Sequence, residues 1–251
     1  FIDGVVGDVT FIIETALDAR GQALVAFPGG NTPKPILEKL AQAPLRWKGV
    51  TIIPTDERLV PVSDPLSNVR MLAKIFLPKG ARVLPLNSEA ADDKLAGSAA
   101  NARLSDLHWP LDLVWLGMGA DGHTASIFPG SDYEEALNPA KGVRAIGVRP
   151  DPFPPEAPVD RVTLTVPAIV EARTTMLVIN GAEKQQVLEQ AIEEGKKSAY
   201  PVGRVIDALT VPVDIFGSPE LRFSPQRRYG SMAMRLSQIQ DGRWKVVSDL
   251  R

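Results

Sequence analysis

Short apolar runs rich in β-branched residues alternate along the chain with longer segments whose apolar residues recur every three or four positions. The short runs predict strands, and the longer segments predict amphipathic helices. Several runs are apolar throughout, as expected of strands covered on both faces. The alternation predicts an α/β fold, a doubly wound, mostly parallel sheet with helices on both faces (Rossmann-like). The predicted strands are Ala23–Phe27, Val50–Pro54, Arg82–Leu86, Leu111–Met118, Arg144–Val148, Arg161–Val166, Thr175–Asn180 and Val211–Phe216, and the predicted helices are Val5–Ala19, Pro33–Ala41, Ser67–Phe76, Glu89–Leu107 and Ala182–Glu194.

The chain after Gly217 differs in character from the part before it. A basic stretch with Arg222, Arg227 and Arg228 precedes two alternating segments around Asp241-Gly242. An Asp-Gly pair between such segments is typical of a hairpin turn. We therefore expect one α/β domain over residues 1–217 and a C-terminal extension over residues 218–251. The extension is interpreted as a peripheral hairpin or added segment, and its role is left open.

Composition narrows the possible functions. The chain has 251 residues, a formal net charge of −2 and no cysteine. This charge argues against a general nucleic-acid binder, and the lack of cysteine excludes disulfides and thiolate chemistry. No apolar run approaches the roughly 20 residues that span a bilayer, and no signal-peptide pattern opens the chain, so we expect a cytoplasmic protein without a membrane partner. The chain opens on Phe1 rather than Met, so we expect an incomplete N-terminus.

A glycine-rich segment, Pro28–Pro33, joins the first predicted strand to the helix after it. Glycines such as Gly29 and Gly30 let the backbone turn sharply and approach a ligand closely. Thr32 suits the N-cap of the helix and Pro33 its first position. Free N–H groups there attract phosphate. A plain strand-to-helix turn explains the same residues equally well.

Charged residues follow other predicted strands. Asp56 and Arg58 stand in Thr55–Pro61, at a strand end where α/β sheets form their ligand crevice. Arg58 could hold a phosphate oxygen and Asp56 could accept sugar hydroxyl protons, although a surface ion pair is a common alternative. Arg161 and Lys184 could add two cations to this set. Each one considered by itself is more simply interpreted as a solvated side chain.

The most specific motif runs from Leu111 to Gly130 and carries Asp121 and His123 in a glycine-rich turn after a strand. Its glycines match the G-x-G-x-x-G pattern of dinucleotide sites. We reject that interpretation because Asp121 would face a pyrophosphate and because Pro129-Gly130 interrupts the required helix. His123 at a strand end can take a proton from water. The other histidine, His108, ends a predicted helix, where a surface or capping role is expected.

Taken together, these motifs resemble the 6-phosphogluconolactonases of the glucosamine/galactosamine-6-phosphate isomerase-like family. The likeness covers about Ala16 to Phe216. Five motifs occur in the same order as in the family: Gly-Gly-x-Thr-Pro; Asp-Glu-Arg-x-Val-Pro with Ser-Asn; Gly-Met-Gly-x-Asp-Gly-His-Thr-Ala-Ser-x-Phe-Pro; Arg-x-Thr-Leu-Thr; and Gly-x-x-Lys. The resemblance implies lactone hydrolysis, a phosphorylated sugar lactone as the partner molecule, and no metal or nucleotide cofactor. It implies that His123 activates water and that phosphate is held by Gly30, Asn31, Thr32, Arg161 and Lys184, with Arg58 nearby.

The chain departs from the family pattern at two places. Asn31 stands where Ser is frequent, and the chain after Gly217 exceeds the usual family end. A rival within the family is a glucosamine-6-phosphate deaminase, which carries a Glu shortly after the histidine. Residues 124–129 contain no carboxylate, which disfavours that chemistry. A non-enzymatic sugar-phosphate sensor would bring a helix-turn-helix, and we find none in the sequence. Monomer and dimer both remain open.

Overall fold

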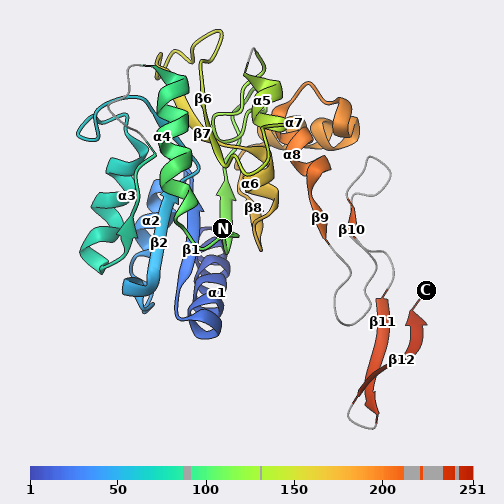
Figure 1. Cartoon of the computed structure of the whole chain (residues 1–251). Coiled ribbons are helices and arrows are strands. Elements are labelled where there is room, and N and C mark those ends of the chain that lie inside the picture. Colours follow the sequence, from blue (N-terminus) through green and yellow to red (C-terminus); the bar gives the residue numbers. More distant parts are fainter. Residues whose placement is uncertain (87–91, 131, 212–220, 223–233, 241–242, 251) are drawn as a thin grey trace.

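A parallel sheet forms the centre of the structure, a computed structural model that describes residues 1–86, 92–130, 132–211, 221–222, 234–240 and 243–250 (Figure 1). Its five strands are β1 (Ala23–Phe27), β2 (Val50–Pro54), β4 (Arg82–Val83), β5 (Leu113–Leu116) and β8 (Thr175–Leu177). They lie in the order β4-β2-β1-β5-β8, and every neighbouring pair is parallel. β1, β2 and β5 are apolar and almost wholly buried, as strands with two covered faces must be.

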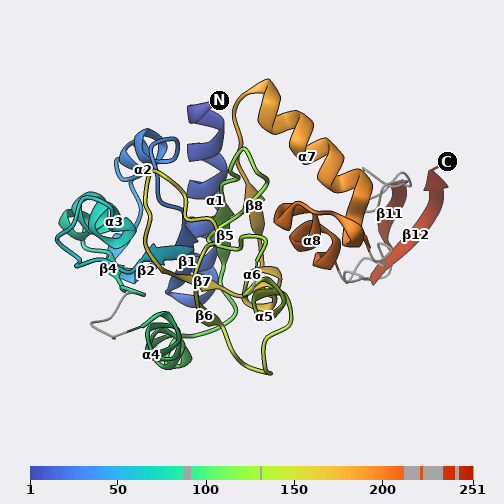
Figure 2. The same cartoon turned by 90° about the horizontal axis from the view of Figure 1, so that it is seen from above.

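Helices cover one face of this sheet, and further helices together with a second sheet cover the other (Figure 2). Side chains of β1 alternate between the faces: Val25 and Phe27 pack with one set of elements, and Leu24 and Ala26 with the other. The first face carries α1 (Ile2–Arg20), α2 (Lys34–Leu40) and α3 (Asn68–Phe76), and the second carries α4 (Asp93–Ser105). The second sheet is antiparallel, in the order β3-β7-β6, with β3 at Asp56–Arg58, β7 at Arg161–Leu164 and β6 at Ala145–Val148.

The order of the strands creates a crevice between β1 and β5. From β1 the chain builds β2 and β4 toward one edge, and β5 and β8 lie on the opposite side of β1. The connections that leave β1 and β5 therefore diverge, and open α/β sheets bind their ligands at this switch point. Six shorter elements and one long helix complete this part of the described structure: α5 (Tyr133–Leu137), α6 (Val166–Val170), α8 (Pro201–Ala208), the 3-10 turns at Trp47–Gly49, Leu77–Lys79 and Gly195–Lys197, and α7 (Ala182–Glu194).

The predicted fold class is confirmed, and several predicted bounds are corrected. The strand predicted over Arg161–Val166 ends at Leu164, because Thr165 caps α6 by accepting from the Ala168 N–H. The strand β3 is absent from the prediction, and α5, α6 and α8 are helices that the pattern did not predict. The first part of the helix predicted from Glu89 lies outside the described residues, and α4 begins at Asp93. No helix of the described part is both long and apolar enough to span a bilayer.

Further strands occur near the C-terminus. β9 (Thr210–Val211) pairs antiparallel with β10 (Leu221–Arg222), and the rest of the strand predicted over Val211–Phe216 lies outside the described residues. β11 (Met234–Gln240) pairs antiparallel with β12 (Arg243–Leu250) on either side of residues 241–242, which also lie outside them. The domain boundary at residue 217 stays a prediction.

Candidate active site

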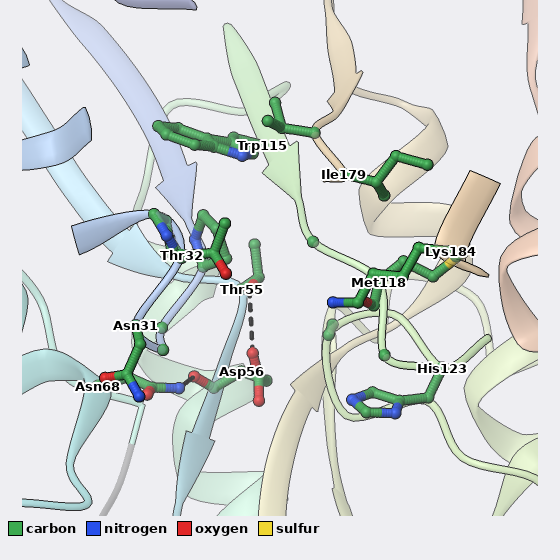
Figure 3. A pocket seen from close by; sticks show the side chains of 18 of the residues that line it. Asn31, Thr32, Thr55, Asp56, Asn68, Trp115, Met118, His123, Ile179 and Lys184 are labelled. Carbon is green, nitrogen blue, oxygen red and sulfur yellow. Dashed lines mark hydrogen bonds between the residues drawn. The ribbon is translucent and has the colours of Figure 1, made fainter. Parts of the chain in front are cut away.

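A cavity of about 230 Å³ lies at the switch point, beyond the carboxyl ends of β1 and β5. Figure 3 shows Asn31, Thr32 and Asp56 on one side of it, and His123 and Lys184 on the other. The cavity thus brings together eight of the ten site residues that the sequence predicts. Its lining consists of Pro28, Gly29, Gly30, Asn31, Thr32, Pro33, Thr55, Asp56, Arg58, Asn68, Trp115, Gly117, Met118, Gly119, His123, Ala125, Val178, Ile179, Asn180 and Lys184.

The loop after β1 supplies backbone donors to the cavity. A side chain at Gly29 would displace the buried Asn68 amide, because its Cβ would lie 1.8 Å from Asn68 Oδ1. Gly30 has φ +96, a conformation that glycine adopts without strain. Within the described part of the chain, the N–H groups of Gly30, Asn31 and Thr32 donate no hydrogen bond, so they are available to an anion.

The predicted cap of the next helix is wrong by one residue. The turn at residues 31–33 precedes α2, so the N-cap is Pro33, whose carbonyl accepts from the Leu37 N–H, and the helix begins at Lys34. Thr32 stays on the cavity wall instead of capping the helix. Thr32 thus lies where a ligand-binding residue of this loop is expected, but it does not cap the helix.

A buried carboxylate organises the second wall of the cavity. Glu57 is fully buried and accepts from the N–H groups of Arg58 (2.8 Å), Asn68 (2.8 Å) and Val69 (2.7 Å) and from the Ser67 hydroxyl (3.1 Å). Burial raises the pKa of Glu57, although the three backbone donors act in the opposite direction. This carboxylate caps α3 and fixes the entry of that helix.

The same wall holds Arg58 and Asp56 in place. Arg58 Nη1 donates to the Leu66 carbonyl (2.8 Å) and to Asn68 Oδ1 (3.3 Å). Asp56 accepts from the hydroxyls of Thr55 (3.0 Å) and Ser126 (2.6 Å). The carboxylate retains lone pairs for further donors, so it can still accept from a ligand. Ser126 belongs to the loop that also carries the histidine, so this bond ties the two walls together.

His123 and Asp121 form a close pair on the opposite wall. Their Nδ1 and Oδ1 atoms are 2.5 Å apart, and Asp121 Oδ1 also accepts from the His123 N–H (3.2 Å). Desolvation tends to raise the pKa of Asp121, but the hydrogen bond and charge of His123 outweigh it and lower that pKa. The imidazole stacks 4.4 Å from the Phe128 ring, centroid to centroid. Nε2 has no partner among the described residues, which leaves it free to act on a ligand or water.

The histidine can lie there only because residue 119 is glycine. A Cβ at Gly119 would lie 2.3 Å from both His123 Cε1 and Nδ1, and 2.5 Å from Asp121 Oδ1. Of the three glycines that fit a dinucleotide fingerprint, Gly119 therefore makes room for the imidazole, whereas a Cβ at Gly122 would meet Tyr200 and one at Gly117 would meet no atom within 4 Å. The Asp121 side chain is more than half exposed and does not line the cavity, so it reaches the cavity only through its contact with His123.

Lys184 reaches the cavity from the first turn of α7, as predicted. Gly181 is the N-cap of that helix and has φ +102. Lys184 Nζ donates to the Met118 carbonyl (2.7 Å), which places the ammonium beside the turn that leads to His123. An ammonium has three N–H donors, so two remain for a phosphate or another anion.

Arg161 occupies a different place from the other predicted residues. Its guanidinium is buried and donates to the carbonyls of Val159 (3.2 Å) and Ala157 (2.9 Å). Burial lowers its pKa, partly offset by the nearby charge of Asp56. Arg161 is not among the described residues that line the cavity, but it lies 5.8 Å from the centroid of the Phe128 ring, behind the histidine.

The fold and the site define an α/β protein whose switch-point cavity is lined by backbone N–H groups, by the cations of Arg58 and Lys184, and by a histidine that pairs with Asp121. The family model described as glucosamine-6-phosphate isomerases/6-phosphogluconolactonase matches residues 1–211. The chain belongs to this family.

Named relatives and solved structures agree with this membership. The chain is 37% identical to a 6-phosphogluconolactonase of Mesorhizobium japonicum, over 85% of this chain and 89% of the relative. Against a 6-phosphogluconolactonase of Rhizobium meliloti it is also 37% identical, over 84% of this chain and 91% of that one. The crystal structure of a 6-phosphogluconolactonase from Shewanella baltica superposes with a TM-score of 0.70 at 30% identity, covering 76% of this chain and 81% of that one.

A more distant structure shares the fold alone. A monomeric glucosamine-6-phosphate deaminase superposes with a TM-score of 0.66 at 18% identity, covering 81% of this chain and 89% of that one. The fold therefore does not by itself select between lactone hydrolysis and deamination. The choice between them depends on the side chains that the cavity presents.

Proposed function

We propose that this protein hydrolyses 6-phospho-D-glucono-1,5-lactone to 6-phosphogluconate. The observation that carries the proposal is His123, held by Asp121, on the wall opposite the Gly30–Thr32 loop, whose N–H groups donate no hydrogen bond within the described part of the chain. The names of the relatives support the choice of substrate. The turn after His123 supports hydrolysis rather than deamination, because residues 124–129 offer no carboxylate for moving carbon-bound protons.

The phosphate of the substrate binds at the β1 loop. The N–H groups of Gly30, Asn31 and Thr32 donate to its oxygens, with the charges of Arg58 and Lys184 on either side. Gly29 permits the close approach of the loop to Asn68, and Asp56 accepts from sugar hydroxyls. Arg161 does not line the cavity, and its buried charge, which interacts with Asp56 and Arg58, adds positive potential to the site without contact.

The reaction needs one activated water molecule. His123 Nε2 takes a proton from water as its oxygen bonds to the lactone carbonyl carbon, and Asp121 holds the imidazole by Nδ1. Positive charge and N–H donors stabilise the tetrahedral oxyanion. The bond from that carbon to the ring oxygen then breaks, and protonated His123 returns the proton to the leaving oxygen. A positioned base of this kind contributes about 10² to 10⁴-fold.

Acid release from freshly prepared lactone, measured against spontaneous hydrolysis, tests the proposal. We expect rapid turnover by the wild type and no ammonia from glucosamine 6-phosphate. His123→Ala should lose turnover, about 10² to 10⁴-fold, while its affinity for 6-phosphogluconate changes only a few-fold. His108→Ala is the matched control, since His108 is exposed and lines no described cavity, and it should keep wild-type turnover.

Three outcomes would contradict the proposal. Near-normal turnover by His123→Ala would remove that residue as the base. Ammonia release would favour the deaminase, and tight binding of 6-phosphogluconate without turnover would favour a sensor. The cytoplasmic location and the monomeric or dimeric state remain predictions, to be tested by cell fractionation and light scattering.

A further inference from the structure

A second, larger cavity adjoins the first one. It has a volume of about 610 Å³ and lies between α2 and α3, which run side by side at one edge of the molecule (Figures 1 and 2). We call it the α2–α3 groove. It shares Gly30, Asn31, Arg58 and Asn68 with the catalytic cavity. Its remaining lining consists of Lys34, Glu38, Ala41, Gln42, Pro65, Ser67, Arg70, Met71, Lys74, Ile75, Pro78 and Lys79.

The groove is positively charged although the whole chain carries a net charge of −2. Five cationic side chains line it, against the single carboxylate of Glu38: Lys34, Arg58, Arg70, Lys74 and Lys79. Glu38 lies 3.9 Å from Lys34 in an exposed pair that neutralises little. Among the residues that the structure describes, the side chains of Arg70 and Lys74 have no hydrogen bond or ion pair, so their charges are uncompensated.

The helix α3 presents cations and apolar side chains next to each other. Arg70 and Lys74 are one turn apart, and so are Met71 and Ile75, so two parallel rows run along the same side of the groove. Arg58 stands at the inner end, where its buried Nε atom has no partner in the described structure. Cations beside an apolar wall suit an organic anion that has both a charged and an apolar part.

We propose that the α2–α3 groove binds a polyphosphate attached to an apolar ring system, a ligand of nucleotide size, while the catalytic cavity stays available to the sugar phosphate. The phosphates lie along Arg70 and Lys74 toward Arg58, and the ring system packs on Met71 and Ile75. The groove has more than twice the volume of the catalytic cavity, so a single sugar phosphate would leave most of it empty.

Occupation of the groove bears on the catalytic cavity through the residues they share. Negative charge beside Arg58 competes for the guanidinium that also faces the substrate phosphate. We therefore expect the ligand to raise the KM for the lactone and to leave kcat unchanged. This effect on KM rests on the proposed function, whereas binding in the groove does not.

Calorimetric titration of the full chain with ATP in the absence of divalent metal tests the proposal, with inorganic tripolyphosphate in parallel. The double variant Arg70→Gln/Lys74→Gln removes the two unpaired cations, and neither residue lines the catalytic cavity. We expect it to weaken ATP binding at least about tenfold, since charge-assisted contacts to phosphate are the strong ones. Lys141→Gln, which removes an exposed cation outside both cavities, should leave binding within about twofold.

The outcomes separate the parts of the proposal. ATP binding that persists in the presence of saturating 6-phosphogluconate supports a separate site, and complete displacement would overturn it. Equal affinity for tripolyphosphate and ATP would overturn the apolar part of the assignment. No ATP binding at millimolar concentration, or equal binding by the double variant, would overturn the site itself. Lactone hydrolysis, assayed on the same preparations, shows separately whether the proposed activity holds and whether each variant is folded.

Discussion

A methyl group at residue 119 tests whether the position of the imidazole sets the reaction rate. In Gly119→Ala the new Cβ would lie 2.3 Å from His123 Cε1 and Nδ1, whereas ordinary contact begins at 3.4 Å. The imidazole must therefore move by about 1 Å and lose its place beside Asp121. The φ of Gly119 lies outside the left-handed region, so alanine fits the backbone without strain. The substitution displaces the base without unfolding its surroundings.

The size of the effect follows from that displacement. A misplacement of about 1 Å in a catalytic group costs about 10²-fold in rate. We expect kcat to fall about 10²-fold, which corresponds to about 2.7 kcal/mol of activation free energy. Thermal unfolding should stay within about 3 °C of the wild type, because one displaced, partly exposed ring changes stability by about 1 kcal/mol or less.

Initial rates of acid release, corrected for spontaneous lactone hydrolysis, measure the effect. Gly117→Ala is the matched control, because a Cβ at Gly117 meets no atom within 4 Å although the residue belongs to the same turn. Its kcat should stay within about twofold of the wild type, even if the methyl group alters KM. Equal kcat values for the two variants would refute the reasoning that the space at Gly119 positions the base.

Three further substitutions probe the rest of the site and its support. Asp121→Asn keeps the shape but removes the charge that holds His123, so kcat should fall about 10- to 100-fold, and an unchanged kcat would show that the pair is not catalytic. Lys184→Ala should mainly raise KM, by about tenfold, because its charge faces the phosphate, and an unchanged KM would remove it from that role. Glu57→Gln turns an amide toward the buried Val69 N–H, so urea unfolding should show a loss of about 2 to 4 kcal/mol. The exposed control Glu14→Gln should change stability by less than about 0.5 kcal/mol, and equal losses in the two would refute the buried cap.

Elements with an uninterrupted local signal could be predicted closely. The observed bounds of Ala23–Phe27, Val50–Pro54 and Ala182–Glu194 equal the predicted ones. The two strands are apolar runs, and the helix begins after Gly181 and ends before Gly195, which punctuate the pattern. In these segments local propensity and tertiary packing favour the same structure, so the sequence alone was sufficient.

Elements that depend on distant partners were missed. β3 consists of Asp56–Arg58, three charged residues that pair with β7, more than a hundred positions later in the chain. Nothing in a charged tripeptide favours a strand. The strand predicted over Arg161–Val166 ran into the first residue of α6, because Val166 is apolar and β-branched, and the helix itself was not predicted. Thr165 followed by Pro167 was the available signal, since threonine caps helices and proline suits their first turn.

Most of the candidate site could be predicted from the sequence, but the contacts that support it from behind could not. Eight of the ten predicted residues line one cavity, since each follows a strand that ends at the same edge of the sheet. Arg161 lies behind the site because nearby carbonyls accept from its guanidinium. Ser126 was not singled out, as its bond to Asp56 joins residues 70 positions apart and leaves no local pattern. Such buried polar pairs become visible only once the chain has folded.

The two walls of the catalytic cavity come from separate parts of the chain and meet through few bonds. The loop after β1, β3 and α7 provides the contacts proposed for phosphate, whereas the base lies in the single turn that follows β5. Among the hydrogen bonds that attach the chain after β5 to its neighbours, Ser126 Oγ donates to Asp56, the Ser126 N–H donates to Thr163, and Lys184 Nζ donates to the Met118 carbonyl. On the proposed assignment, the residues that bind the phosphate and the residue that acts as the base thus belong to different segments of the chain. A designer could exchange residues 119–128 for another turn that keeps Ser126, and so change the reaction performed on a sugar phosphate without rebuilding the part that holds it.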